Sequence, residues 1–163
     1  MPGGDSLYTI VASFQGKRLT AVDTIQALFI AANQADCVIP GNESLEVFKK
    51  KAFFYYISDD INKATAALLD EMVATLTQFN CVKLEIMGHT CNIGRTDEVN
   101  YELSVRRAEA VKKYLMNKGV AEDRLVISGF GSTRPLLSNK SEYGRIKNRR
   151  VEFKVVAKGN ETE

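Results

Sequence analysis

The sequence contains little that would indicate a disulfide-rich domain, a metal site or a membrane span. It has 163 residues, of which three are cysteines, three are prolines, one is a histidine and none is a tryptophan. The three cysteines make an odd count without paired spacing, which is typical neither of a disulfide framework nor of a zinc site. Their simplest interpretation is as small, mostly buried apolar residues. No apolar run approaches the roughly eighteen residues of a membrane span, so no spanning helix is expected.

Zinc is the one metal that the composition suggests, because Cys37, Cys81, Cys91 and His89 would together supply a Cys3His set. Cys81 and Cys91, however, flank the run VKLEIMGHT. An extended run rises about 3.3 Å per residue and would place these two cysteines roughly 30 Å apart. A disulfide needs Cα atoms within about 7 Å, so only Cys37 could partner either of them, and which one it partners stays open. The sequence therefore predicts no metal site and no cofactor.

A large excess of one charge is also absent. Twenty-two Lys and Arg residues against twenty Asp and Glu residues leave a formal net charge of +2. Binding to a phosphate backbone demands a concentrated basic face, so nucleic acid is not expected as a partner. The opening MPGGDS lacks the basic and apolar regions of a signal peptide. A chain separated from its leader or anchor would begin in the same way, so this absence does not identify the compartment.

The residues that are present predict a folded domain with an N-terminal extension. Hydrophobic residues make up 45% of the chain, which is ample for a core. Apolar residues alternate along SLYTIVASF as in a half-buried strand, and they recur at helical spacing along AVDTIQALFIAANQA. A short apolar CVI then precedes the turn signal Pro40-Gly41. Residues 1–48 are therefore expected to form a strand-helix extension, in which we find no functional motif.

Residues 49–157 carry a stronger pattern, and residues 158–163 form a tail. Period-two alternation predicts strands at KAFFYYI, VKLEIMG, RLVISGFG and NRRVEFKVVA. Helices are predicted at SDDINKATAALLDEMVATLTQF, with Ser or Asp in the capping positions, and at ELSVRRAEAVKKYLMNKG, which ends at Gly119. The order is strand, helix, strand, helix, strand, strand. It predicts a two-layer α+β fold in which both helices pack on one face of a mixed sheet.

One arginine falls on the apolar face of the second predicted helix. At about 100° per residue, Arg107 lies among Leu103, Ala108 and Val111, whereas Arg106 projects toward the solvated flank. A guanidinium on an apolar surface is costly unless its charge is paired and its donors are used. Arg107 is therefore expected to be buried against a carboxylate or a ring of carbonyls. These acceptors belong either to the protein or to a ligand whose carboxylate fits the planar donor fork.

A second inward arginine is expected in the last strand. Arg149 shares the alternation phase of Val151 and Phe153, which places its side chain toward the core. Its expected role is structural, with a carboxylate from the edge of the core as its partner.

Four separated motifs resemble those of the OmpA-like peptidoglycan-binding domain family. They read GHT-x-x-x-G, N-x-x-LS-x-RRA-x-AV, DRL-x-x-x-G-x-G-x-x-x-P and GR-x-x-NRRVEF, and they span about residues 54–156. Several motifs in the correct order make a specific match. The family includes the C-terminal domains of outer-membrane porins, the peptidoglycan-associated lipoprotein and flagellar motor stators. Its members hold the cell wall non-covalently by recognising diaminopimelate in the stem peptide.

The resemblance also implies a ligand pocket. In the family, an aspartate after GHT takes the ligand's ammonium group, and the arginine before the alanine of RA takes its carboxylate. That arginine is Arg107 here, and the resemblance places Asn100, Leu103 and Ser104 along the pocket. The candidate ligand-binding residues are Thr90, Cys91, Asp97, Asn100, Leu103, Ser104 and Arg107.

The sequence departs from the family pattern at the carboxylates. Cys91 occupies the position of the expected aspartate. The family's FDFDS run reads FYYIS, so Ile57 replaces a second carboxylate. An ammonium group needs a carboxylate or a set of acceptors, and neither of these two side chains supplies one. Asp97, in a loop that is one residue longer than usual, is the remaining candidate to reach the pocket.

The resemblance implies non-covalent binding of peptidoglycan by a porin-associated or lipoprotein-like protein. Such a protein would tether itself or the outer membrane to the wall, in the periplasm of a Gram-negative type of envelope. The alternative is a domain that has kept the fold, lost wall recognition and serves as a structural or partner-binding module, with an envelope protein as its partner. The oligomeric state stays open.

An enzyme is not expected, and no catalytic residue is proposed. His89 and Cys91 lie two residues apart, but neighbours along a strand make a poor nucleophile-base pair, and no third group orients them. His89 is expected to be a hydrogen-bonded residue at a strand end.

Overall fold

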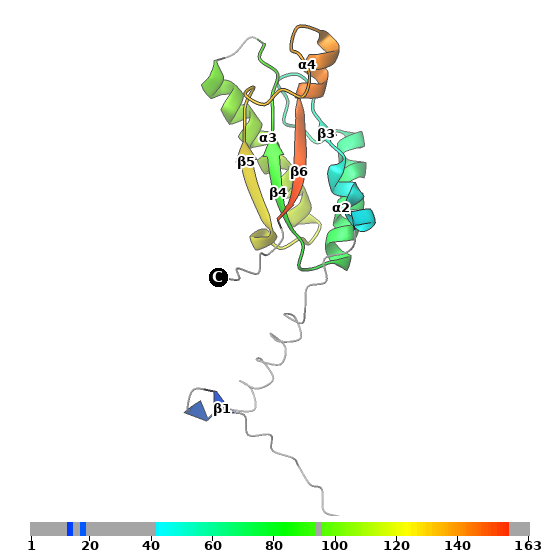
Figure 1. Ribbon diagram of the computed structural model, residues 1–163, viewed down its shortest axis with the longest axis vertical. Coiled ribbons are helices and arrows are strands. Elements are labelled where there is room, and N and C mark those ends of the chain that lie inside the picture. Colours follow the sequence, from blue (N-terminus) through cyan, green and yellow to red (C-terminus); the bar gives the residue numbers. More distant parts are fainter. Residues whose placement is uncertain (1–12, 15–16, 19–41, 94–95, 157–163) are drawn as a thin grey trace, which may run out of the picture. The chain divides into compact units, whose positions relative to one another are not determined.

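The computed structural model describes residues 13–14, 17–18, 42–93 and 96–156 (Figure 1). The chain divides into two units, Met1–Val38 and Ile39–Glu163. In the first unit, β1 (Ser13–Phe14) pairs antiparallel with β2 (Lys17–Arg18). Strand β1 falls at the end of the first predicted strand. The predicted helix, the CVI segment and the tail lie outside the described residues.

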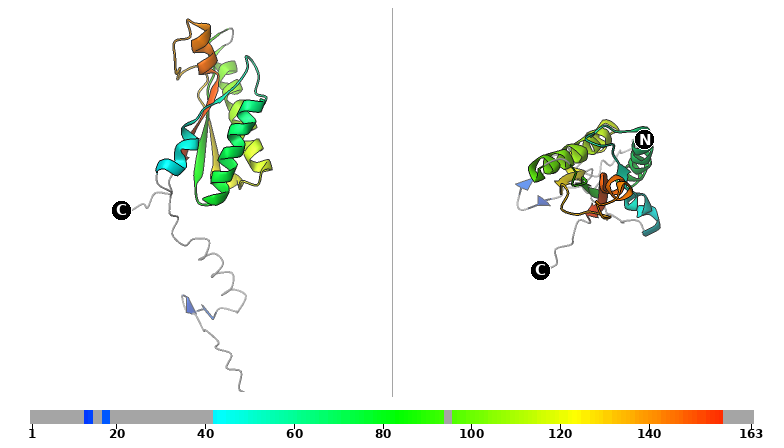
Figure 2. Two further views of the ribbon diagram at one scale, coloured as in Figure 1. Left: turned by 90° about the vertical axis from the view of Figure 1, so that its right-hand side faces the viewer. Right: turned by 90° about the horizontal axis from the view of Figure 1, so that it is seen from above.

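The second unit is a two-layer α+β fold, as predicted. Its four-stranded sheet has the order β3-β6-β4-β5. The strands are β3 (Ala52–Phe53), β4 (Lys83–Gly88), β5 (Leu125–Gly129) and β6 (Arg150–Val156). Strands β4 and β5 run parallel, and β6 is antiparallel to both β3 and β4. Helices α2 (Lys63–Gln78) and α3 (Asp97–Asn117) lie on the same side of the sheet (Figure 2).

The apolar core lies between the sheet and these two helices. In β4, Leu84 and Ile86 are fully buried while their neighbours are half-buried, which is the alternation expected of a strand with one covered face. The helices contribute, at helical spacing, Leu69, Met72, Leu76, Val111 and Leu115. The 3-10 helix η1 (Asn42–Lys49) adds Phe48, which is also buried in this core.

Both long helices begin at residues other than those predicted. Helix α2 starts after Asn62, whose side chain accepts a hydrogen bond from the Thr65 backbone N at 2.9 Å, so the predicted Ser and Asp caps are wrong. Helix α3 starts at Asp97 rather than Glu102, with Thr96 as its N-cap. Asp97 therefore belongs to the first turn of a helix and not to a loop. The predicted end is confirmed, because Gly119 follows the C-cap with a φ of 97°.

A third helix, α4 (Glu142–Asn148), lies where the sequence predicts a loop. Ser141 is its N-cap. At its other end Asn148 is fully buried, and its Oδ1 accepts hydrogen bonds from the backbone N of Leu136 and of Leu137 at 2.7 and 3.0 Å. These bonds fix the preceding loop against α4 and hold the end of the helix at the start of β6.

Strand β4 and helix α3 approach each other closely at Gly88. A Cβ atom at this position would lie 1.9 Å from the backbone O of Ser104, so any other residue would force the strand and the helix apart. This contact sets the N-terminal half of α3 against the carboxyl end of β4. The candidate site lies at that end.

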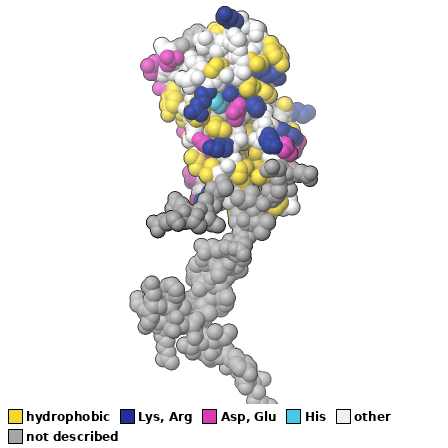
Figure 3. All heavy atoms as spheres, viewed as in Figure 1, with side chains coloured by type: hydrophobic (Ala, Val, Ile, Leu, Met, Phe, Trp, Pro, Cys, Tyr) yellow, Lys and Arg dark blue, Asp and Glu magenta, His cyan; other side chains and the backbone are white. Residues whose placement is uncertain are grey.

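The opposite face of the sheet is covered by no long helix among the described elements (Figures 1 and 3). Basic and acidic side chains are interleaved on this face, as in the pair of Arg150 Nε and Glu152 Oε1 at 2.7 Å. Interleaved charges agree with the small net charge of the chain. In the described part of the chain, no helix is long and apolar enough to cross a membrane.

Candidate ligand-binding site

The site is a small cavity at the carboxyl end of β4. The loop after β3, the N-terminal half of α3 and the end of α4 meet there (Figure 1). The cavity has a volume of about 10 Å³, which is room for a single water molecule. It is lined by Tyr56, Ile57, Thr90, Cys91, Ile93, Asn100, Leu103, Arg107 and Arg149. We call it the arginine cavity.

Arg107 is fully buried, which confirms its predicted position. Its Nε donates to Ser58 O at 2.9 Å, its Nη1 to His89 O at 3.0 Å and its Nη2 to Tyr55 O at 2.9 Å. The predicted ring of carbonyls is therefore present, and it ties α3 to two other segments. Burial lowers the pKa of Arg107 to about 10, so the side chain is charged at neutral pH. Two of its five N–H donors have no partner among the described residues.

Thr90 and Cys91 directly follow β4 and are both buried. The Thr90 backbone N donates to Gly131 O at 2.8 Å, but its hydroxyl has no hydrogen-bond partner in the described part of the chain. Cys91 is a free thiol, so it takes part in no disulfide, whereas Cys81 is disulfide-bonded. The end of β4 thus presents one unsatisfied hydroxyl and one thiol to the cavity.

Arg149 is the C-cap residue of α4, directly before β6 begins, so its predicted place in the last strand is wrong, while its predicted burial is confirmed by an exposed fraction of 8%. Its Nη2 lies 3.4 Å from Glu142 Oε1, so the expected carboxylate partner exists, although it belongs to α4. Its Nε is buried without a partner among the described residues. Its Cζ lies 5.9 Å from the centroid of the Tyr56 ring. The sequence predicts only a structural role for Arg149, whereas the structure places it in the wall of the arginine cavity.

Two of the predicted site residues lie elsewhere. The Ser104 hydroxyl donates to Tyr101 O at 2.6 Å and accepts from Gly131 N at 3.0 Å, so it joins α3 to the turn after β5. Asp97 is exposed in the first turn of α3, where its charge favours the helix N-terminus. It lines a separate concavity of about 590 Å³ together with Tyr101 and Phe130. The structure therefore does not bring a carboxylate from Asp97 to the arginine cavity.

The mouth of the arginine cavity is apolar and half exposed. Tyr56, Ile57 and Ile93 have exposed fractions of 50%, 42% and 40%. Ile57 has a φ of 61°, which is unfavourable for a β-branched residue. Sequence reasoning missed Tyr56 and Ile93, because a single exposed apolar residue in a loop carries no periodic signal.

His89 lies beside the site and is buried. Its ring stacks on Phe130 with a centroid distance of 5.3 Å. Neither ring nitrogen has a hydrogen-bond partner among the described residues. The expected hydrogen bonds of His89 are made by its backbone, because its N donates to Arg150 O at 2.9 Å and its O accepts from Arg107. Desolvation lowers its pKa to about 4, and the ring is therefore neutral at pH 7. Within the described ranges, no group of His, Cys, Asp and Glu is arranged to hold a metal ion.

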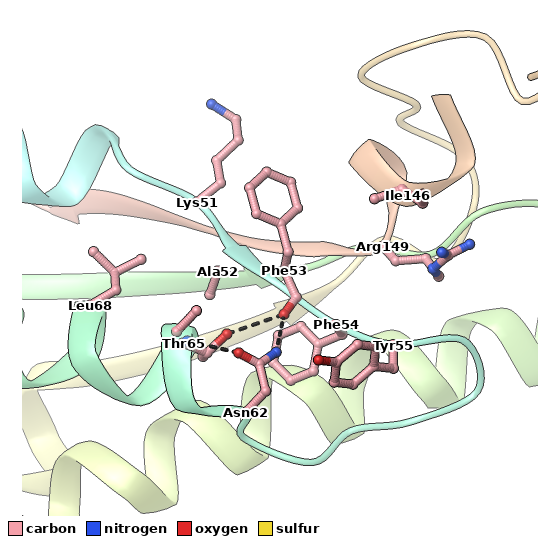
Figure 4. A pocket seen from close by; sticks show the side chains of 11 residues that line it. Lys51, Ala52, Phe53, Phe54, Tyr55, Asn62, Thr65, Leu68, Ile146 and Arg149 are labelled. Atoms are coloured by element: carbon pink, nitrogen blue, oxygen red, sulfur yellow. Dashed lines mark hydrogen bonds between the residues drawn. The ribbon is translucent and has the colours of Figure 1, made fainter. Parts of the chain in front are cut away.

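A wider groove of about 370 Å³ runs beside β3 and shares Arg149 with the arginine cavity (Figure 4). Phe53 and Ile146 are among its apolar lining residues. The Phe53 carbonyl accepts hydrogen bonds from Asn62 Nδ2 at 2.8 Å and Thr65 Oγ1 at 3.1 Å. Arg107 and Thr90, which carry unsatisfied donors, line the arginine cavity and not this groove. The arginine cavity is therefore the stronger candidate site.

Thr90→Val is expected to stabilise the domain by about 1–2 kcal/mol, because it removes a buried hydroxyl that has no partner. The free energy of unfolding in urea measures this effect. Thr65→Val is the matched control, since the Thr65 hydroxyl donates to Phe53 O and its loss should destabilise the domain. A loss of stability in Thr90→Val as large as that in Thr65→Val would contradict the prediction.

Comparison with known proteins relates this geometry to a family. The sequence model described as the OmpA family matches residues 53–149. Outer membrane protein A of Bordetella avium is 36% identical over 110 residues, which cover 68% of this chain and 56% of that protein. The peptidoglycan-binding protein ArfA of Mycobacterium tuberculosis is 44% identical over 73 residues, which cover 45% of this chain and 22% of that protein. The chain thus spans about half of the first relative and less than a quarter of the second.

A solved structure shows the same fold. The peptidoglycan-associated lipoprotein from Burkholderia pseudomallei has a TM-score of 0.65 and 26% sequence identity, and the match covers 74% of this chain and 100% of that chain. The residues of the family match include every residue that lines the arginine cavity. Fold and sequence therefore agree, and this chain belongs to the OmpA family.

Proposed function

We propose that this domain binds peptidoglycan non-covalently, with Arg107 receiving the carboxylate of diaminopimelate in the stem peptide. The observation that carries the proposal is the buried guanidinium of Arg107, which keeps two N–H donors beside the unpartnered hydroxyl of Thr90. Paired donors of this kind suit a carboxylate. The names of two relatives support the same ligand, because one is peptidoglycan-binding and the other is peptidoglycan-associated.

In this proposal the domain is a tether in the cell envelope. One relative is named as an outer membrane protein, which supports a position on the periplasmic side of the outer membrane. Catalysis has no part in the proposal. The His89 ring is neutral and lacks a hydrogen-bond partner among the described residues, so it is not arranged as a general base for Cys91.

A pull-down with purified sacculi that contain diaminopimelate tests the proposal. We expect the wild-type chain to stay on the sacculi at moderate salt, and Arg149→Gln to weaken retention about tenfold, because it removes one of two cations from the cavity wall. Arg106→Gln is the matched control, since Arg106 is exposed and lies 3.9 Å from Asp59. Clean elution of the wild-type chain would instead favour the structural or partner-binding alternative.

A further inference from the structure

We infer that the arginine cavity recognises a carboxylate alone and does not require the ammonium group that accompanies it in a zwitterion. This inference rests on the proposed function and narrows it. It concerns which of the two charged groups at the free end of the diaminopimelate side chain determines affinity.

The charge of the cavity wall is the first argument. Arg107 and Arg149 contribute two guanidinium groups, and none of the described lining residues is an aspartate or a glutamate. Glu142, the partner of Arg149, has a side chain that is 60% exposed and does not line the cavity. An ammonium group entering the cavity would therefore meet two positive charges and no carboxylate among the described lining residues.

The unsatisfied hydrogen-bonding groups are the second argument. They include two N–H groups of Arg107, the buried Nε–H of Arg149 and the hydroxyl of Thr90. All of them can donate, and a carboxylate can accept several such hydrogen bonds through its roughly four lone-pair positions. The nearby carbonyls that could accept from an ammonium group already accept from Arg107. The cavity wall thus offers donors to an anion and few acceptors to a cation.

The mouth of the cavity is the third argument. Tyr56, Ile57 and Ile93 surround the entrance with apolar side chains, and the enclosed volume is about 10 Å³. Because the cavity has room for only one water molecule, a carboxylate is expected to bind at this entrance, with the rest of the ligand against the apolar side chains. The ammonium group, which is bonded to the same carbon atom as the carboxylate, then lies at this entrance, where no aspartate or glutamate lines the cavity.

Calorimetric titration of the full chain with three forms of one muropeptide tests this inference. The forms are the diaminopimelate disaccharide-tetrapeptide, the same molecule acetylated on the free diaminopimelate amine, and the same molecule amidated on the free diaminopimelate carboxylate. We expect acetylation to change the dissociation constant by less than twofold and amidation to raise it at least tenfold. A tenfold loss on acetylation, or equal binding of the amidated form, would overturn the inference.

A substitution at Cys91 provides a second test, because it places a carboxylate in the wall of the cavity. Cys91→Asp is expected to bind the unmodified muropeptide about tenfold more tightly than the wild-type chain does, and to lose this gain with the acetylated form. Arg106→Gln, which changes an exposed side chain that does not line the cavity, should leave both affinities unchanged. Equal affinity of Cys91→Asp for the free and acetylated forms would contradict the assigned position of the ammonium group.

Failure of the inference differs from failure of the proposed function. If the folded wild-type chain, checked by its backbone amide spectrum, binds none of the three muropeptides, the wall-binding proposal fails and the inference fails with it. If it binds the unmodified form but loses the acetylated form, wall binding stands and only the carboxylate-alone inference is overturned.

Discussion

Arg107→Ala is expected to lower the free energy of unfolding by about 3–5 kcal/mol and to abolish retention on sacculi. The wild-type side chain is fully buried and donates to the carbonyls of Tyr55, Ser58 and His89, which would lose this partner in the interior of the domain. The guanidinium also lies 5.3 Å from the centroid of the Phe54 ring, so packing is lost as well. Urea unfolding measures the first effect and the sacculus pull-down the second.

The neighbouring arginine is the control for this prediction. Arg106 has a side chain that is 46% exposed and lies 3.9 Å from Asp59. Exposed ion pairs contribute little, so Arg106→Ala should change stability by less than about 1 kcal/mol. If the two alanine variants unfold at the same urea concentration, the structural role assigned to Arg107 is wrong.

A fall in stability of roughly 3 kcal/mol is expected when the pH is lowered from 6.5 to 4. Desolvation lowers the pKa of His89 to about 4 in the folded protein. An unfolded histidine titrates near 6.5, so between these values the unfolded chain binds a proton that the folded chain does not. The contribution of neutral His89 is therefore fully present above pH 6.5 and is lost progressively as the pH falls to about 4. Urea unfolding at a series of pH values measures this slope.

His89→Phe isolates the histidine in this experiment, because it keeps an aromatic ring beside Phe130 and does not titrate. Carboxylates also titrate in acid. The hydrogen bond from Arg145, for example, lowers the pKa of Glu142, whose contribution is lost as the pH falls below the ordinary glutamate range. Such contributions are common to both proteins, so the difference between the two slopes reports His89. Identical slopes would show that the buried ring is not the cause.

The parts of the fold that could be predicted are those with a local signal. Alternation along β4 and helical spacing along α3 depend on one segment each, and the burial of Arg107 follows directly from the second. Helix α4 could not be predicted, because Asn148 fixes it through bonds to Leu136 and Leu137, which lie twelve and eleven residues earlier in the chain. A seven-residue helix is too short to show a repeating apolar face.

The site was predictable only in part. Helical spacing alone indicates Arg107, whereas Thr90 and Cys91 enter through the family resemblance. Asp97 was expected in a loop that precedes the helix. Thr96 instead caps α3 directly before Asp97, so Asp97 lies in the first turn of this helix. Ser104 shares a helix with Arg107, but its hydroxyl bonds to Gly131, a partner that no pattern within α3 could reveal.

The carbonyl bonds of Arg107 also have a consequence for evolution. A lineage that stopped attaching to a wall would still need this arginine to hold three backbone segments together, so selection for folding alone would retain Arg107. Thr90 differs, because its hydroxyl bonds to no described group and its loss is expected to make folding easier. Among descendants of this chain, the residue at position 90 should therefore distinguish those that still bind a ligand from those that keep only the fold.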